Sequence, residues 1–153
     1  MPGRVLRIHN VQANEEPLLV LKRKALTARN QVYFHIANRT IPYPLGRNRI
    51  IYIGTTQRGI ERVLSSIGER AAKAFSTWGV DMLEVHRIGC KPVQRVKTWK
   101  KLESASIIAF REEYGRIPKL NKHGEKYRKT DEFEYFNRDE IVRFLKHWEH
   151  VQD

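Results

Sequence analysis

Cysteine is nearly absent from the 153-residue chain: Cys90 alone can form neither an intramolecular disulfide nor a thiolate zinc cluster. No apolar stretch approaches the roughly eighteen residues that a membrane-spanning helix needs, and the N-terminus lacks the apolar run of a signal peptide. A low cysteine content is typical of a reducing compartment. We therefore expect a cytoplasmic protein without a membrane partner, and its length favours a single domain over residues 1–153.

Acidic residues are also scarce, because 17 Asp and Glu face 29 Lys and Arg, which gives a net charge of +12. The imbalance is uneven: residues 131–153 hold seven acids and three bases, whereas the preceding 130 residues hold 10 acids and 26 bases. Such an excess favours a polyanionic partner, since each neutralised phosphate releases counterions. Charge alone also fits a ribosomal or other basic protein without an activity.

Hydrophobic periodicity predicts a mixed α and β fold. Residues 31–37 and 49–54 alternate apolar and polar side chains and predict a hairpin, joined by a loop over 38–48 that contains Pro42 and Pro44. Further elements follow from the same patterns. They are extra N-terminal strands at 5–11 and 18–26, a helix at 59–75, a strand at 82–88, a helix at 93–114 that begins near Pro92 and ends at Gly115, a basic loop at 116–130, and a last helix capped by Asn137.

On the helix predicted at 59–75, the apolar stripe consists of Ile60, Val63, Leu64, Ile67, Ala71 and Ala74. Arg58, Arg62, Ser66, Glu69 and Arg70 fall outside that stripe, so we expect them to face away from the core.

Two short motifs on the predicted hairpin are recognisable. Val32-Tyr33-Phe34 and Tyr52-Ile53-Gly54 resemble the pair of motifs that name the GIY-YIG nuclease superfamily. Thr56 and Arg62 follow Tyr52 at the spacing at which that family places a threonine and its catalytic arginine. Glu103 lies on the second long helix like the family's metal-binding glutamate, and Asn121 is similar to its terminal asparagine. The resemblance spans about ninety residues.

The resemblance implies an α/β fold of the α+β type, with a small, mostly antiparallel three-stranded sheet flanked by helices. Residues 31–124 would form the catalytic core, 1–30 an N-terminal extension and 131–153 a C-terminal helical extension. The resemblance implies an endonuclease, such as one of the restriction or phage type, that hydrolyses DNA phosphodiester bonds with Mg²⁺ or Mn²⁺ and no organic cofactor. Its catalytic residues would be Tyr33, Tyr52, Arg62, Glu103 and Asn121, with Glu103 as metal ligand.

The chain departs from the family pattern at two places. The first motif lacks its glycine, and Ser66 stands where many members carry a histidine or tyrosine. His35 and His123 are the candidates that could substitute for the histidine or tyrosine that is missing at position 66. Which of the two tyrosines acts as the base is open at this point.

The residue types support the same chemistry independently. Glu103 is the only acid between Glu84 and Glu112 and has apolar or small neighbours, so it needs a counter-cation or faces a cleft. A lone hard oxygen ligand suits Mg²⁺, which keeps most of its waters. Arg62 can fork onto a phosphate. The structural alternatives are a surface salt bridge for Glu103, with Lys100 or Arg95, and a solvated helix face for Arg62.

Double-stranded DNA is the expected partner, and a double-strand cut from one active site per chain would favour a homodimer. The residues predicted to contact DNA are Arg58, Arg70, Lys97, Lys100, Lys119, Lys122, Lys126 and Arg128. Two alternatives are a nucleic-acid-binding module of the same fold without activity, and a nuclease that acts on RNA.

Overall fold

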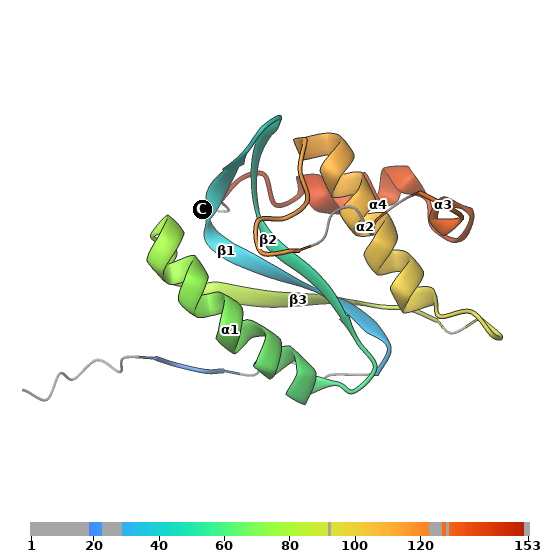
Figure 1. Ribbon diagram of the computed structural model, residues 1–153, viewed down its shortest axis with the longest axis horizontal. Helices are drawn as coiled ribbons and strands as arrows, with labels where there is room; N and C mark the ends of the chain where they lie inside the picture. Colours follow the sequence, from blue (N-terminus) through green and yellow to red (C-terminus); the bar gives the residue numbers. More distant parts are fainter. Residues whose placement is uncertain (1–18, 23–28, 92, 123–126, 128, 152–153) are drawn as a thin grey trace, which may run out of the picture.

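The computed structural model describes residues 19–22, 29–91, 93–122, 127 and 129–151. It confirms the α+β class with a three-stranded antiparallel sheet in the order β2-β1-β3 (Figure 1). The elements are β1 (Gln31–Tyr43), β2 (Gly46–Thr56), α1 (Ile60–Trp78), β3 (Leu83–Gly89), α2 (Thr98–Tyr114), α3 (Glu132–Tyr135) and α4 (Arg138–Lys146).

The sheet has two different faces, because successive side chains of a strand point to opposite sides. One face, the apolar face, carries Val32, Phe34 and Ile36 of β1 and packs beneath α2 and α4; the Phe34 ring lies 4.8 Å from that of Phe144. The opposite face, called the tyrosine face below, carries Tyr33 and His35 of β1 and Tyr52 of β2. Helix α1 lies on this second side (Figure 1).

The predicted loop over 38–48 is wrong, since both strands continue into it and only a tight turn joins Tyr43 to Gly46. Proline is a loop signal because it cannot donate a ladder hydrogen bond. Strand β3 pairs with β1 only as far as Ala37, so Pro42 lies where β1 has one open side and a proline is tolerated. The pairing with β2 also shifts register between Ile36 and Ile41.

The second long helix begins at Thr98 and not at 93, whereas its predicted end is confirmed. Val93 and Val96 pair across a turn in which Arg95 adopts a left-handed conformation (φ 63°), which breaks the helix there. Pro92, the predicted helix start, lies outside the described residues. Gly115 ends the helix at φ 77°, and its N–H donates to the carbonyl of Arg111.

The predicted C-terminal helix is confirmed as α4. The Asn137 side chain accepts hydrogen bonds from the backbone N–H groups of Asp139 (2.9 Å) and Glu140 (3.3 Å), as an N-cap residue does. Arg138 forms ion pairs with Glu112 and Glu113 of α2. Helix α4 is therefore attached to the same layer as α2. The short helix α3 was not predicted.

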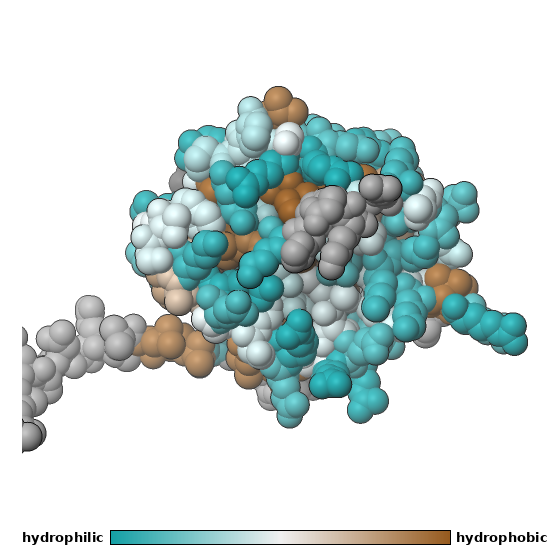
Figure 2. Space-filling view, in the orientation of Figure 1, coloured by the Kyte–Doolittle hydropathy of each residue, from teal (hydrophilic) through white to brown (hydrophobic). Residues whose placement is uncertain are grey.

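The predicted N-terminal strands lie mostly outside the described residues. Of that region, residues 19–22 are in neither a helix nor a strand and extend away from the body, with Leu19, Val20 and Leu21 exposed (Figures 1 and 2). Within the described part of the chain, no helix combines the length and the apolar character needed to cross a bilayer.

Candidate active site

Three rings form a cluster at the centre of the tyrosine face. In the antiparallel pairing, His35 lies opposite Tyr52 and Tyr33 lies opposite Gly54. The ring centroids of Tyr33 and Tyr52 are 6.0 Å apart, and the His35 ring lies 5.6 Å from Tyr33 and 4.9 Å from Tyr52. The two predicted phenols are thus neighbours, as the strand alternation indicated.

Gly54 makes room for both phenols. A Cβ atom at this position would lie 2.6 Å from Cε1 of Tyr52 and 2.9 Å from both Cζ and the hydroxyl of Tyr33. Separations this short do not occur between packed atoms, so any side chain at Gly54 would displace one of the rings. The glycine of Tyr52-Ile53-Gly54 is therefore required sterically by the two tyrosines.

The two phenols differ in exposure. Tyr33 is only 1% exposed, whereas Tyr52 is half-buried and is the phenol of the pair that solvent reaches more easily. Burial, together with the nearby Tyr33 and Glu103, raises the pKa of Tyr52 to about 12, while the positive charge of Arg70 acts in the opposite direction. In the protein as it stands, Tyr52 is protonated at neutral pH and needs further positive charge to become a base.

His35 and Gln31, on the same face of β1, are buried without hydrogen-bond partners among the described residues. Both ring nitrogens of His35 and both side-chain polar atoms of Gln31 are in this state. Burial and the charge of Arg70 lower the pKa of His35 to about 3, so its ring is neutral at physiological pH. His35, a candidate from the sequence, therefore belongs to the cluster; His123 lies outside the described residues.

The apolar stripe predicted for helix α1 is confirmed in part. Val63 and Ala74 of the stripe are buried, whereas Leu64 is half exposed. Ser66 and Arg70, expected to face outward, also lie on the side of the helix that faces the sheet: Ser66 is buried, and the guanidinium of Arg70 lies over the Tyr52 ring. The sheet-facing side of α1 therefore combines apolar residues with two polar ones beside the phenols.

Arg62 lies at the beginning of α1 and is exposed. It lines a hollow of about 320 Å³ together with Thr55, Thr56, Gln57 and Arg58. In the described part of the chain, the structure shows no hydrogen bond, ion pair or cation–π contact between Arg62 and either phenol. Arg62 thus shares a hollow with Arg58, one of the residues predicted to contact DNA.

Glu103, on α2, is half-buried and close enough to act electrostatically on Tyr52 and Tyr127. Burial raises the pKa of its carboxyl group to about 7, and the charge of Lys100 opposes that rise. Among the described residues, Glu103 has no hydrogen bond or ion pair, so neither salt bridge considered from the sequence forms. A carboxylate in this environment is stabilised by a cation.

The described residues contain no group of three or more His, Cys, Asp or Glu side chains that could hold a metal ion. A magnesium site that keeps several waters uses one or two carboxylates. Glu103, a hard oxygen donor to which no cation of the described part of the chain is paired, fits that requirement.

Asn121 fixes the backbone of β2 beside the cluster. Its Oδ1 accepts from the N–H of Ile53 (2.9 Å) and its Nδ2 donates to the carbonyl of Ile53 (2.8 Å), so the side chain pairs with the strand edge as another strand would. The N–H of Leu120 donates to the carbonyl of Ile51. The predicted asparagine therefore holds the residue between Tyr52 and Gly54.

The residues predicted to contact DNA fall into different environments. Lys97, Lys100 and Lys122 are exposed, as is Arg58; Lys119 is half-buried with its ammonium 5.3 Å from the Tyr43 ring. Arg70 is directed at Tyr52 instead of solvent. Lys126 and Arg128 lie outside the described residues.

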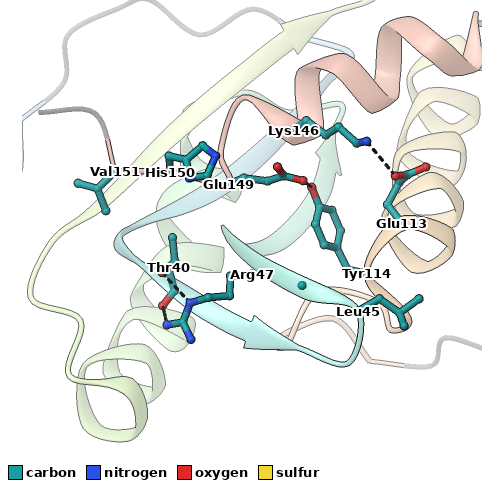
Figure 3. A pocket seen from close by; sticks show the side chains of 10 residues that line it. Thr40, Leu45, Arg47, Glu113, Tyr114, Lys146, Glu149, His150 and Val151 are labelled. Atoms are coloured by element: carbon teal, nitrogen blue, oxygen red, sulfur yellow. Dashed lines mark hydrogen bonds and ion pairs between the residues drawn. The ribbon is translucent and has the colours of Figure 1, made fainter.

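A second hollow, of about 690 Å³, lies at the hairpin tip near the ends of α2 and α4 (Figure 3). Its charged side chains are paired locally: Arg47 with Thr40, Lys146 with Glu113, and Glu149 with the hydroxyl of Tyr114. None of the residues predicted to be catalytic lines it. The tyrosine cluster therefore remains the candidate site.

Comparison with protein-family models, curated proteins and solved structures returned no match for this chain.

Proposed function

We propose that the protein is a divalent-metal-dependent endonuclease of the GIY-YIG type that hydrolyses phosphodiester bonds in double-stranded DNA. One observation carries the proposal: two phenols are packed around a glycine, and a half-buried carboxylate, Glu103, is near enough to act electrostatically on one of them. The chain carries a net charge of +12, which suits a phosphate backbone.

Each residue has a chemical task in this proposal. Tyr52 or Tyr33 orients and deprotonates the attacking water, and Arg62 forks onto phosphate oxygens from the exposed start of α1. Glu103 would hold Mg²⁺ or Mn²⁺, which would supply positive charge where negative charge develops on the phosphate. Asn121 keeps β2 in place, and the exposed cations Arg58, Lys97, Lys100 and Lys122, together with Lys119, position the duplex without reading its sequence.

Plasmid cleavage tests the proposal. Wild-type protein with Mg²⁺ is expected to nick or linearise supercoiled plasmid, and EDTA or Glu103→Gln is expected to abolish the cleavage. Glu140→Gln is the matched control, since it removes an exposed carboxylate on α4 that is not part of the tyrosine cluster, and should leave the rate unchanged. DNA binding without cleavage by wild-type protein would instead support a binding module, and preferential cleavage of labelled RNA would redirect the proposal to that substrate.

A further inference from the structure

The guanidinium group of Arg70 is held from two sides. Its Nη1 donates to the carbonyl of Ser66 (3.0 Å) and to the Ser66 hydroxyl (2.9 Å), and its Cζ lies 3.7 Å from the centroid of the Tyr52 ring. Cation–π attraction acts out to about 6 Å, so this is a close contact. A planar guanidinium stacks on a ring and donates hydrogen bonds from a fixed fork in its own plane, whereas a lysine ammonium has neither a planar face nor a fixed fork.

The two partners of Arg70 are themselves fixed. Ser66 is buried at 2% exposure in the middle of α1, and Tyr52 is anchored in β2, where its ring also lies 4.9 Å from that of His35. Tyr52 is thus held between a cation from the helix and a ring from the neighbouring strand. These two contacts restrict the rotation of the Tyr52 side chain about the bond that carries its ring.

We propose that Arg70 is a positioning residue, which acts from α1 through the Tyr52 ring to hold the phenol in its reacting orientation; this inference rests on the proposed nuclease function. The placement distinguishes Arg70 from the exposed Arg62 and Arg58, which face the hollow at the start of the helix. It also gives the buried Ser66 a task, because a small side chain at that position leaves space for the guanidinium and accepts its hydrogen bond.

Kinetics with Arg70→Met tests the role, with Lys73→Met as the matched control. Both variants remove one positive charge from α1, and Lys73 is exposed. Arg70→Met is expected to lower the single-turnover cleavage rate at saturating DNA about tenfold, with the DNA dissociation constant changed no more than in Lys73→Met. Lys73→Met should keep the wild-type rate. Unchanged single-turnover cleavage with weakened DNA binding would make Arg70 a phosphate contact and overturn the proposal.

Two conservative variants separate positioning from folding. Arg70→Lys keeps the charge but loses the planar fork, and Ser66→Ala removes one of the two hydrogen bonds while leaving the guanidinium. Both are expected to cleave at rates between those of wild-type protein and Arg70→Met. Wild-type rates in both would overturn the proposal even if Arg70→Met does not fold.

A spectroscopic readout keeps this inference separate from the nuclease proposal. The ring signals of Tyr52 and His35 in a ¹³C NMR spectrum at neutral pH are expected to move in Arg70→Met and Arg70→Lys, but not in Lys73→Met. This result does not require cleavage, so an inactive wild-type protein would overturn the nuclease proposal while the ring signals still report on Arg70. Ring signals that are the same in wild type and both Arg70 variants would overturn the contact itself.

Discussion

The two faces of the sheet are built on opposite principles. On the apolar face, Val32, Phe34 and Ile36 are completely buried against hydrophobic side chains of α2 and α4. On the tyrosine face, four buried polar atoms of Gln31 and His35 have no partner among the described residues. Leaving a buried polar atom unpaired costs about 1–3 kcal/mol. The first face stabilises the fold mainly by apolar burial, although the indole nitrogens of Trp99 and Trp148 in the core also have no partner among the described residues. The second face carries a cluster of unpaired polar groups that cost stability, as functional sites do.

Phe34→Ala should have the largest effect on stability. Phe34 has no exposed surface and packs on Phe144, so truncation leaves a cavity in the apolar face and should cost about 3–5 kcal/mol. Urea unfolding at neutral pH measures this loss. Tyr33→Phe, on the neighbouring position of the other face, removes a single hydroxyl and should cost much less. Similar losses from the two variants would mean that the faces contribute equally.

Gly54→Ala should have the second-largest effect on stability, because its Cβ would overlap both phenol rings. We expect a loss of up to about 3 kcal/mol in urea unfolding and a marked fall in plasmid cleavage. Gly68→Ala is the matched control: nothing lies within 4 Å of its Cβ, and alanine in the interior of α1 should stabilise the protein by about 0.5–1 kcal/mol. A stable and active Gly54→Ala variant would show that the phenols need not be packed as they are.

Asn121→Ala should have a smaller effect on stability than Gly54→Ala, because it acts only on the hydrogen bonds at the edge of β2. It removes both hydrogen bonds to Ile53 and leaves a backbone donor and acceptor unpaired in a buried place, which should cost about 2 kcal/mol. Asn121→Asp, which keeps the acceptor for the Ile53 N–H but loses the donor, should fall between wild type and Asn121→Ala. Equal stability of all three proteins would show that the segment before residue 122 is held by other contacts.

Strand alternation and helix periodicity were sufficient to predict the sheet and most of its neighbours. Alternation placed Tyr33 and Tyr52 on one side of the sheet. Asn137 at the start of α4 and Gly115 at the end of α2 identified two helix ends, because capping signals are local in sequence. The hairpin loop was predicted wrongly, since the tolerance for Pro42 depends on where β3 stops pairing, and a pairing partner far along the chain, such as Leu83 opposite Ala37, is not visible locally.

The inward position of Ser66 and Arg70 on α1 could not be predicted for a related reason. The apolar stripe of the helix indicated the buried Val63 and Ala74 correctly, yet the sheet also presents phenols and His35 to the helix, and polar Ser66 and Arg70 pack there as well. A hydrophobic stripe indicates the whole buried side of a helix only where the opposing surface is apolar. Arg70 was therefore grouped with the DNA contacts, whereas its placement over Tyr52 gives it a different candidate role.

His35→Phe should have the smallest effect on stability of these variants. It replaces a polar ring of the tyrosine face by an apolar one, as found on the apolar face. A phenylalanine ring occupies similar space without unpaired nitrogens, so the variant should be about 1 kcal/mol more stable at pH 7 in urea unfolding. His150→Phe, at an exposed position, should change stability little. A destabilised His35→Phe variant at pH 7 would show that the His35 nitrogens are hydrogen-bonded in solution.

The dependence of stability on acidic pH provides a second, independent test of the His35→Phe variant. The folded-state pKa of His35 is lowered to about 3 from 6.5, so between those values the unfolded chain binds a proton that the folded protein does not. The stability linked to the neutral ring is complete above about pH 6.5 and is lost as the pH falls toward 3. His35→Phe has no such proton to bind and should lose less stability than wild type between pH 7 and about pH 4.5. Equal losses would mean that His35 binds its proton in the folded protein over that range. The inference that its ring is neutral beside Arg70 and Tyr52 would then be wrong.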